Sequence, residues 1–514
     1  MKHTDHGIRL PMLDNQMVSQ PRGWNLLALP VIGPFFRWKY SRFVLQLPLI
    51  ILVVLMLVDG FTGRQIAARN VATTAAWVHY RGLLVIALAV IGNLFCAACP
   101  LMFTRGATRY FEKFLPRKLE WPRFLRNKWL VVILLLAIFV SYEVFNLWAS
   151  PWLTAWITVG YFATVFAIDT LFPAGTFCKY VCPLGNFNFS LASVSPTQIV
   201  AVDPDVCRAC VHKPCLYGRE TWHTEAESGG NAAFIPLTEI INPNGTGYFP
   251  GCETGLYVPT MTGNSDCTLC LNCVRACPYD NVAISTRSPW RELTNKVWDK
   301  ARHSMLYLGM LLAVWGVMNA FAMIPQFFQL ADNIALTLHT TNEALIIVSL
   351  FATVTVVGLG AFSVFALLAE YIGTGTWNIR GAIRRWGYVL VALGFGFWTA
   401  HYLFHFLTGA TAAVPVLEHF FSYRGANLTP NWRLAQLVPS QLLFPLQAVI
   451  TAVYAVVSMI ITGRIGMRDF GRKGVLAMWP ILIFILLFTL LQLLILGQPM
   501  EMRGSILGPN LLHP

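Results

Sequence analysis

Nine predominantly apolar segments constrain the fold of this chain more than any other feature. A helix needs about 20 apolar residues to cross the hydrocarbon core of a bilayer, and most of these segments approach or exceed that length. They lie near residues 43–59, 82–95, 129–148, 152–172, 304–325, 342–371, 387–408, 437–462 and 475–497. Only 12% of the residues are charged, whereas soluble proteins average about 25%. The sequence therefore predicts an α-helical integral membrane protein, in contact with the lipid bilayer through about nine transmembrane helices.

The basic residues divide unevenly between the segments that join these helices. With the N-terminus on the cytoplasmic side, 31 of the 37 lysine and arginine residues lie in cytoplasmic segments and 6 lie outside. Basic residues in short loops favour the cytoplasmic side. We therefore expect a multi-pass protein of a bacterial-type inner (plasma) membrane, with its N-terminus cytoplasmic and its C-terminus outside. The net charge of +13 follows from this topology and does not indicate a nucleic-acid partner.

One long polar stretch interrupts the apolar pattern. It is rich in Gly, Pro, Asn and Asp and holds eight of the 12 cysteines. Four parts are therefore expected: a cytoplasmic N-terminal segment (1–42), a four-span membrane domain (43–183), a cytoplasmic ferredoxin-like α+β domain (184–302) and a five-span membrane domain (303–514). The cysteines of the chain lie in C-x2-C, C-x3-C-P and ferredoxin-like groups, which favour metal ligation over disulfides.

The segment Cys267–Pro278 carries the most specific motif in the chain. Its cysteines follow the spacing C-x2-C-x2-C-x3-C-P, which ligates cubane clusters in bacterial ferredoxins. In two-cluster ferredoxins the fourth cysteine of such a run ligates the other cluster. Zinc sites usually use two separated C-x2-C pairs instead, so the motif predicts a [4Fe–4S] cluster.

A second, stretched cysteine group lies upstream. Its spacing is C-x2-C-x4-C, and the next cysteine is Cys252. The exchange of fourth ligands assigns Cys277 to the upstream group and Cys252 to the downstream one. The sequence thus predicts two [4Fe–4S] clusters, the first ligated by Cys207, Cys210, Cys215 and Cys277, and the second by Cys252, Cys267, Cys270 and Cys273. The alternative is a zinc ion in the first group, or Cys252 as a buried thiol.

Two further cysteine pairs, each followed by proline, lie at predicted helix ends. They are Cys96/Cys99 before Pro100 and Cys178/Cys182 before Pro183. Proline cannot continue a helix, so each is expected to mark a helix stop. Both pairs are predicted on the cytoplasmic side, where four thiolates could form one site for a third iron–sulfur cluster or a soft metal such as Cu(I) or Zn. Buried thiol pairs or redox-active dithiols are the alternatives.

Three histidines in the C-terminal half are candidates for a membrane cofactor. His401 and His405 are four residues apart and share a helix face, and His339 is predicted near the same, outer side. Histidines within spans are functional candidates. They predict a haem b between His339 and either His401 or His405, or a quinone site. An interfacial histidine bonded to a loop carbonyl is the alternative.

Acidic and small residues within the predicted spans give weaker signals. Glu143 is a candidate proton site, whereas Asp169 and Glu370 lie near helix ends and are expected to reach the interface. Gly358, Gly360, Gly394 and Gly396 are predicted to be helix-packing positions.

Together, the Cys-Pro pairs and the ferredoxin motif resemble the NapH/NosR-type membrane-bound polyferredoxins. The resemblance covers about residues 43–300 and rests on Cys96-x2-Cys99-Pro100, Cys178-x3-Cys182-Pro183 and Cys267–Pro278. It implies a quinol- or redox-linked electron-transfer subunit that serves a reductase or metal-site maturation. The x2 spacing of the first pair, the stretched first cluster motif and the added five-span domain depart from that pattern.

Three functions are consistent with these features. The first is a membrane-bound iron–sulfur protein that passes electrons between a membrane quinol, haem or outer-side donor and a cytoplasmic partner, as part of a quinone-linked oxidoreductase. The second is a copper-handling or metalloenzyme maturation factor. The third is an electron-relay subunit of a larger respiratory complex.

Overall fold

The computed structural model describes residues 23–105, 108, 111, 119–220, 248–295, 303–435 and 438–500. The first 22 residues of the predicted N-terminal segment, and residues 221–247 of the predicted ferredoxin-like domain, lie outside this range. The chain forms two compact units. A cysteine-rich unit contains residues 1–41, 197–264 and 271–287, and a helical unit contains residues 42–196, 265–270 and 288–514.

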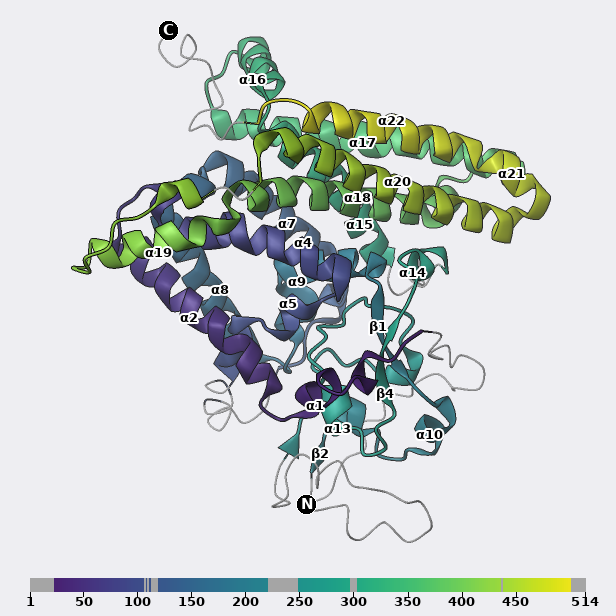
Figure 1. The fold of residues 1–514 in the computed structure, drawn as a ribbon. Helices are drawn as coiled ribbons and strands as arrows, with labels where there is room; N and C mark the ends of the chain where they lie inside the picture. The colour runs from purple at the N-terminus through teal and green to yellow at the C-terminus, as the bar shows by residue number, and fades with distance from the viewer. Residues whose placement is uncertain are drawn as a thin grey trace. The chain divides into compact units, whose positions relative to one another are not determined.

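Eight helices of the described chain are long and apolar enough to cross a membrane (Figure 1). The second of them joins α3 (Val71–Thr73), a π-helical turn (Thr74–His79) and α4 (Tyr80–Val90). The others are α2 (Ser41–Thr62), α8 (Pro151–Leu171), α15 (His303–Phe321), α17 (Glu343–Thr374), α18 (Ile379–Gly409), α20 (Ser440–Phe470) and α22 (Trp479–Leu496). The prediction of an α-helical membrane protein is confirmed.

The ninth predicted span corresponds to a shorter helix, α7 (Trp129–Val144), of 16 residues. At 1.5 Å per residue it is about 24 Å long, less than the roughly 30 Å hydrocarbon core. The helix ends early because Asn146 adopts a left-handed conformation with φ of 46°, and a 3-10 turn (Leu147–Ala149) follows. Among the described residues, eight helices rather than nine therefore meet the length of a span.

Shorter helices connect these spans. In the helical unit they are α5 (Leu94–Ala97), α9 (Pro183–Leu191), α14 (Arg291–Thr294), α16 (Pro325–Leu338), α19 (Ala413–Ser422) and α21 (Gly474–Ala477). Brief 3-10 or π turns complete the unit at Ala67–Arg69, Pro100–Thr104, Arg123–Leu125, Phe177–Val181, Ala192–Val194, Ala410–Ala412, Trp432–Leu434 and Gly471–Lys473.

The helices α15 and α18 form the centre of the helical unit. They are buried over most of their apolar lengths, unlike α2 and α8. Gly394 permits this close approach, because a Cβ atom there would lie 2.6 Å from the Cα atom of Ala313. The indole of Trp398 also donates a hydrogen bond to the carbonyl of Leu312 (2.8 Å). A Cβ atom at Gly396 would likewise meet Tyr454 of α20, and one at Gly358 would meet Val314 of α15. Three of the predicted packing glycines are therefore confirmed as contact positions. The prediction was wrong for Gly360, where a Cβ atom would have no neighbour within 4 Å.

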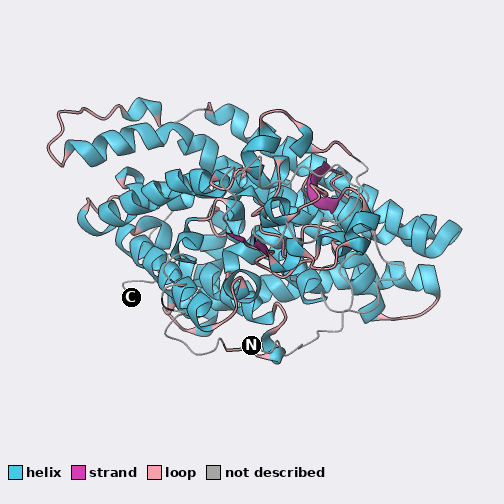
Figure 2. Ribbon diagram, turned by 90° about the horizontal axis from the view of Figure 1, so that it is seen from below, coloured by secondary structure: helices cyan, strands magenta, loops and turns pink. Residues whose placement is uncertain are grey.

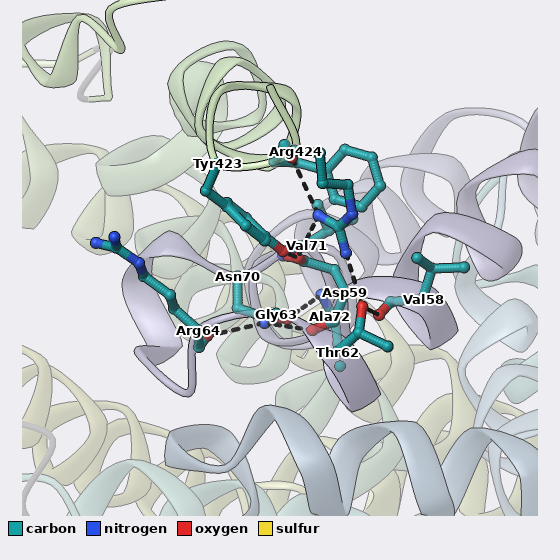
Figure 3. A network of polar contacts seen from close by, with 12 residues as sticks. Val58, Asp59, Thr62, Gly63, Arg64, Asn70, Val71, Ala72, Tyr423 and Arg424 are labelled. Atoms are coloured by element: carbon teal, nitrogen blue, oxygen red, sulfur yellow. Dashed lines mark hydrogen bonds and ion pairs between the residues drawn. The ribbon is translucent and has the colours of Figure 1, made fainter. Parts of the chain in front are cut away.

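A buried polar network joins the end of α2 to the segment after α19 (Figure 3). The carboxylate of Asp59 accepts hydrogen bonds from the backbone N–H of Val71 (2.7 Å) and from the Tyr423 hydroxyl. It also pairs with the guanidinium of Arg424 at 3.3 Å. The amide of Asn70 donates to the Asp59 carbonyl (2.9 Å). The network therefore ties the first membrane helix to the C-terminal half of the same unit.

The cysteine-rich unit consists of short elements, including two small antiparallel sheets (Figure 2). One pairs β1 (Thr197–Ala201) with β4 (Val282–Thr286), and the other pairs β2 (Arg219–Glu220) with β3 (Tyr248–Phe249). The helices are α1 (Ile32–Arg37), α10 (Pro204–Ala209), α11 (Pro214–Tyr217) and α13 (Asn272–Ala276), with 3-10 turns at Leu26–Ala28 and Val258–Thr260. The unit is thus α+β in content, while its ferredoxin-like identity stays a prediction.

The N-terminal residues pack within the cysteine-rich unit. Asn25 forms a β-bridge to Ser285 of β4. The Arg37 guanidinium forms a two-point ion pair with Asp280, at 2.9 and 2.8 Å. The sequence did not indicate this association, because the ion pair joins residues 243 positions apart.

Candidate functional site

Four cysteines from two separate segments line one pocket of the cysteine-rich unit. They are the cysteines of the first predicted cluster: Cys207, Cys210, Cys215 and Cys277. Cys207 lies on α10, Cys210 ends that helix, and Cys215 lies on α11. Cys277 ends α13. The structure therefore brings this predicted set together.

The stretched spacing of the first group has a local explanation. Lys213, just before α11, adopts a left-handed conformation with φ of 44°. This turn reverses the chain after Cys210, so that Cys215 also faces the pocket despite the two additional residues. The Lys213 ammonium lies 5.3 Å from the centre of the Tyr257 ring, and the Tyr257 hydroxyl donates to the Cys207 carbonyl (3.1 Å).

Asn281 connects the two halves of the pocket. Its side-chain amide donates to Cys207 Sγ (3.2 Å), and its backbone N–H donates to Cys277 Sγ (3.4 Å). The same amide group bonds the backbone of Asp203 at 2.6 and 2.8 Å. Amide donors to sulfur stabilise thiolates and tune bound clusters.

The four thiols are grouped in a way that disfavours their charged forms. Burial, with a smaller contribution from neighbouring thiolates, raises the pKa of Cys207 to about 11 and that of Cys215 to about 12. Burial also raises the pKa of Cys210 and Cys277. A positively charged metal centre would remove this penalty, because thiolates are its ligands.

The cysteines of the second predicted cluster divide between the units. Cys252 and Cys273 belong to the cysteine-rich unit, and Cys267 and Cys270 to the helical unit. The backbone N–H of Cys252 donates to the Cys215 carbonyl (3.0 Å). The Asn272 amide, next to Cys273, donates to the Gly251 carbonyl (3.2 Å). Ligation of one cluster by all four stays a prediction.

The backbone around Cys267 and Cys270 is strained. Asp266, Leu269 and Leu271 have φ values of 63°, 51° and 59°, which are uncommon for residues other than glycine. Such strain tends to persist at functional sites.

The two Cys-Pro pairs are brought together within the helical unit. Cys99, Cys178 and Cys182 belong to one packed cluster with Met102 and Phe177. Cys96 is linked to the cluster through α9. The Asn188 amide donates to Cys96 Sγ at 3.5 Å, while the Asn186 amide donates to the carbonyls of Cys178 (3.1 Å) and Cys182 (2.9 Å).

Proline both follows a helix end and begins the next helical segment at these pairs. Pro183 is the first residue of α9, and Cys182 caps that helix by accepting a hydrogen bond from the Gly185 N–H (3.2 Å). Pro100 likewise begins the 3-10 turn after Cys99. The predicted helix stops are confirmed, because helical segments end at Val181 and at Ala97; proline in addition begins the next helical segment, a position for which it is well suited.

The loop that carries Cys267 packs against both Cys-Pro segments inside the helical unit. The Asn93 amide donates to the Cys267 carbonyl (3.0 Å). The buried Lys128 ammonium pairs with Asp266 at 2.5 Å and donates to the Lys179 carbonyl at 2.7 Å. The segment before Cys96 thus contacts Cys267 directly, and Lys128 bridges the segment of Cys178 to the residue before Cys267.

The histidines occupy different environments. His401 and His405 are buried on α18 with ring centres 4.8 Å apart. Among the described residues, neither ring nitrogen of His401 has a hydrogen-bond partner, nor does Nε2 of His405. His339 is exposed at the end of α16, with φ of 48°. The binding of haem or a quinone by these histidines stays a prediction.

Arg81 is a buried cation that sequence reasoning missed. Its guanidinium lies 4.5 to 5.2 Å from the ring centres of Trp77, Tyr142 and Tyr402, and it donates to the Tyr142 hydroxyl (3.2 Å). The neighbouring Glu143 retains one buried carboxylate oxygen without a partner. The sequence could have indicated Arg81, because a charge within an apolar helix is unusual. The predicted span began at residue 82, however, and so left Arg81 in the preceding loop.

The other intramembrane acids are paired. Asp169 pairs with Arg105 at 3.0 Å, and Glu370 pairs with Arg385 at 3.2 Å. In the part of the chain that the structure describes, no three His, Cys, Asp or Glu side chains are grouped closely enough to hold a single metal ion.

Comparisons with protein-family models, with curated proteins and with solved structures found no match to this chain.

Proposed function

We propose that the chain is a membrane-bound iron–sulfur electron-transfer protein. One observation carries this proposal: Cys207, Cys210, Cys215 and Cys277, which are up to 70 positions apart in the sequence, line a single pocket. Four thiols, apolar walls and amide donors to sulfur are the features that hold a [4Fe–4S] cluster. The bound cluster would supply one-electron chemistry, and the four cysteines would hold it while Asn281 orients two of them.

A path for electrons between the membrane helices and this cluster follows from the remaining cysteines. The Cys-Pro pairs would hold a third cluster or a soft metal, and Cys252, Cys267, Cys270 and Cys273 would hold the second cluster. The contacts of Asn93 and Lys128 with the Cys267 loop support this order. The electron donor would be a membrane quinol, a haem or an outer-side protein, and the acceptor a cytoplasmic partner.

Metal analysis of the purified chain tests the proposal. We expect about eight iron and eight acid-labile sulfide per chain, or about twelve of each with a third cluster, and EPR signals after reduction with dithionite. Cys210→Ala should remove one signal and about four iron atoms. Val211→Ala, at an exposed neighbouring position, is the matched control and should retain all of them.

A second candidate is the handling of copper or another soft metal at the Cys-Pro pairs. These pairs lie in one part of the helical unit, although no three of their thiols are grouped closely enough to hold a single ion. Cys182→Ala distinguishes the two. A loss of about four iron atoms would support a third cluster, whereas a loss of copper or zinc with iron unchanged would support metal handling. Stoichiometric copper with only traces of iron in the unmodified protein would contradict the electron-transfer proposal.

The buried pair His401 and His405 is the proposed site for a haem b or quinone. A reduced-minus-oxidised visible spectrum and a quinone assay of the lipid extract distinguish these ligands. His401→Leu should remove the ligand, while His339→Leu should do so only if the exposed His339 is a second haem ligand.

A further inference from the structure

Two corners of the helical unit pack against each other, one between α17 and α18 and the other between α20 and α22. A Cβ atom at Gly373, near the end of α17, would lie 2.5 Å from the ring of Phe470 at the end of α20. The Arg385 guanidinium pairs with Glu370 of α17 at 3.2 Å and with Asp469 of α20 at 3.1 Å. These contacts hold the two corners together at one end of the helices, where α21 marks the second corner in Figure 1.

The two corners carry a large excess of positive charge. Residues 370–386 and 463–474 hold seven lysine and arginine residues but only two acidic ones. Both acids already pair with arginines, Glu370 with Arg385 and Asp469 with Arg385 and Arg468. Four further basic side chains are exposed and form no ion pair or hydrogen bond with the described residues: Arg380, Arg384, Arg472 and Lys473.

The stability of the helices does not explain this grouping of charge. Arg380 and Arg384 are four residues apart on α18, so they share a face and repel each other. Arg380 also lies in the first turn of α18, where a positive charge opposes the helix dipole. Positive charge in these loops agrees with their predicted cytoplasmic side, but that rule requires only the sign of the charge, and not unpaired basic side chains at two adjoining corners. An anion bound by these side chains would relieve the repulsion.

Exposed aromatic and apolar side chains lie beside these charges. Trp377, two residues before α18, is 63% exposed and stacks on Tyr371 with the ring centres 4.4 Å apart. At the second corner, Leu476 and Trp479 are 65% and 54% exposed, and they follow Lys473 by three and six residues. Trp and Tyr are enriched where a membrane meets water. The basic side chains are therefore expected at the level of the lipid headgroups, with apolar surface beside them for acyl chains.

We propose that the two corners form a binding site for an anionic phospholipid of the predicted cytoplasmic leaflet. The four exposed basic side chains bind the headgroup, because guanidinium and ammonium groups pair with phosphate and the planar guanidinium can bind two of its oxygens. Trp377 and Trp479 contact the adjoining acyl chains. A free phosphate ion would leave this apolar surface uncovered, so a lipid is the occupant that fits both parts of the site. The site contains no cysteine and does not depend on the proposed function.

Native mass spectrometry of the delipidated full-length protein tests the proposal. Phosphatidylglycerol should bind more tightly than phosphatidylcholine with the same acyl chains, because choline cancels the charge of the phosphate. Inorganic phosphate at the same concentration should not displace it. Each basic residue near an anionic membrane surface contributes about fivefold in affinity, so phosphatidylglycerol should bind Arg380→Gln/Arg384→Gln about 25-fold more weakly. Arg472→Gln/Lys473→Gln, at the other corner, should show a similar loss.

Arg123→Gln/Arg126→Gln is the matched control. It removes two exposed positive charges from another loop on the same predicted side and should retain the affinity of the unmodified protein. An equal loss in this control, equal binding of the two lipids, or displacement by inorganic phosphate would overturn the proposal. An affinity that is unchanged in both corner variants would also overturn it, and would leave an acidic protein as the partner of these charges.

Discussion

Asn281 is the residue on which the geometry of the four-cysteine pocket most depends. It bonds the sulfur atoms of Cys207 and Cys277 and the backbone of Asp203. In Asn281→Ala the side-chain bonds to Cys207 Sγ and to the part-buried backbone of Asp203 are lost, at a cost of about 0.5–1.5 kcal/mol for each bond. We therefore expect the first cluster to be released several-fold faster to an iron chelator, measured as the decay of its EPR signal.

Asn264→Ala provides the comparison for that experiment. Asn264 is also buried in the cysteine-rich unit and donates to the Thr197 carbonyl (2.7 Å), but it does not line the pocket. An equal rate of release in both variants would mean that Asn281 stabilises the unit in general and not the pocket.

The residues that support the pocket were less predictable than its cysteines. Cysteine spacing is a local property, so the sequence predicted the set Cys207, Cys210, Cys215 and Cys277 that the structure groups together. Asn281 has no such signature. Its position depends on contacts between distant segments, which no short motif records.

At the scale of elements, the lengths of the apolar segments predicted the membrane helices well. The exception is the second span, whose first part contains polar residues and was therefore not recognised as helix. The second span begins at Val71, not near residue 82. Thr74, His79 and Arg81 lowered its apparent hydropathy, yet they are accommodated because this segment packs against α18. There, the ring of His79 lies 3.0 Å from the Ala410 carbonyl, and a Cβ atom at Gly82 would overlap Phe406. Tertiary packing thus satisfies polar groups that a hydropathy profile treats as breaks.

Among the polar contacts between elements, we expect the one between α2 and the segment after α19 to contribute most to the free energy of unfolding. Asp59 is 1% exposed and accepts from Val71, Tyr423 and Arg424 (Figure 3). Asp59→Ala leaves the Arg424 charge and the Val71 N–H without this partner. Removing one member of a buried pair costs about 3–5 kcal/mol. The midpoint of unfolding in mixed detergent micelles should therefore shift to a clearly lower denaturant concentration.

Two further variants show whether that shift comes from the network. Glu120→Ala removes a carboxylate that pairs with Arg126 at an exposed site and should have no measurable effect. In Asp59→Ala/Arg424→Ala, the loss should be less than the sum of the single losses, because the unpaired charge is gone. Additive losses would mean that the two side chains act independently.

At the scale of the whole molecule, the decisive question is whether α7 crosses the membrane. Its 16 residues make it short, but the distribution of positive charge favours a crossing. With α7 as a span, 31 lysine and arginine residues lie on the cytoplasmic side and 6 outside. Without it, every later segment changes sides, and the same residues divide 17 against 20. Because the first division follows the positive-inside rule and the second does not, we expect α7 to span, with local thinning of the bilayer.

Cysteine labelling in intact bacterial cells tests this topology. Asn127 and Asn146 flank α7, and a membrane-impermeant maleimide should label Asn146→Cys but not Asn127→Cys. Later in the chain, Ala426→Cys should be labelled and Thr376→Cys protected. After the cells are opened, Asn127→Cys and Thr376→Cys should react, which shows that protection came from the membrane. If Asn127→Cys and Asn146→Cys were accessible from the same side, α7 would not cross, and the cysteine-rich unit would face the opposite side from the one proposed, away from any cytoplasmic electron acceptor.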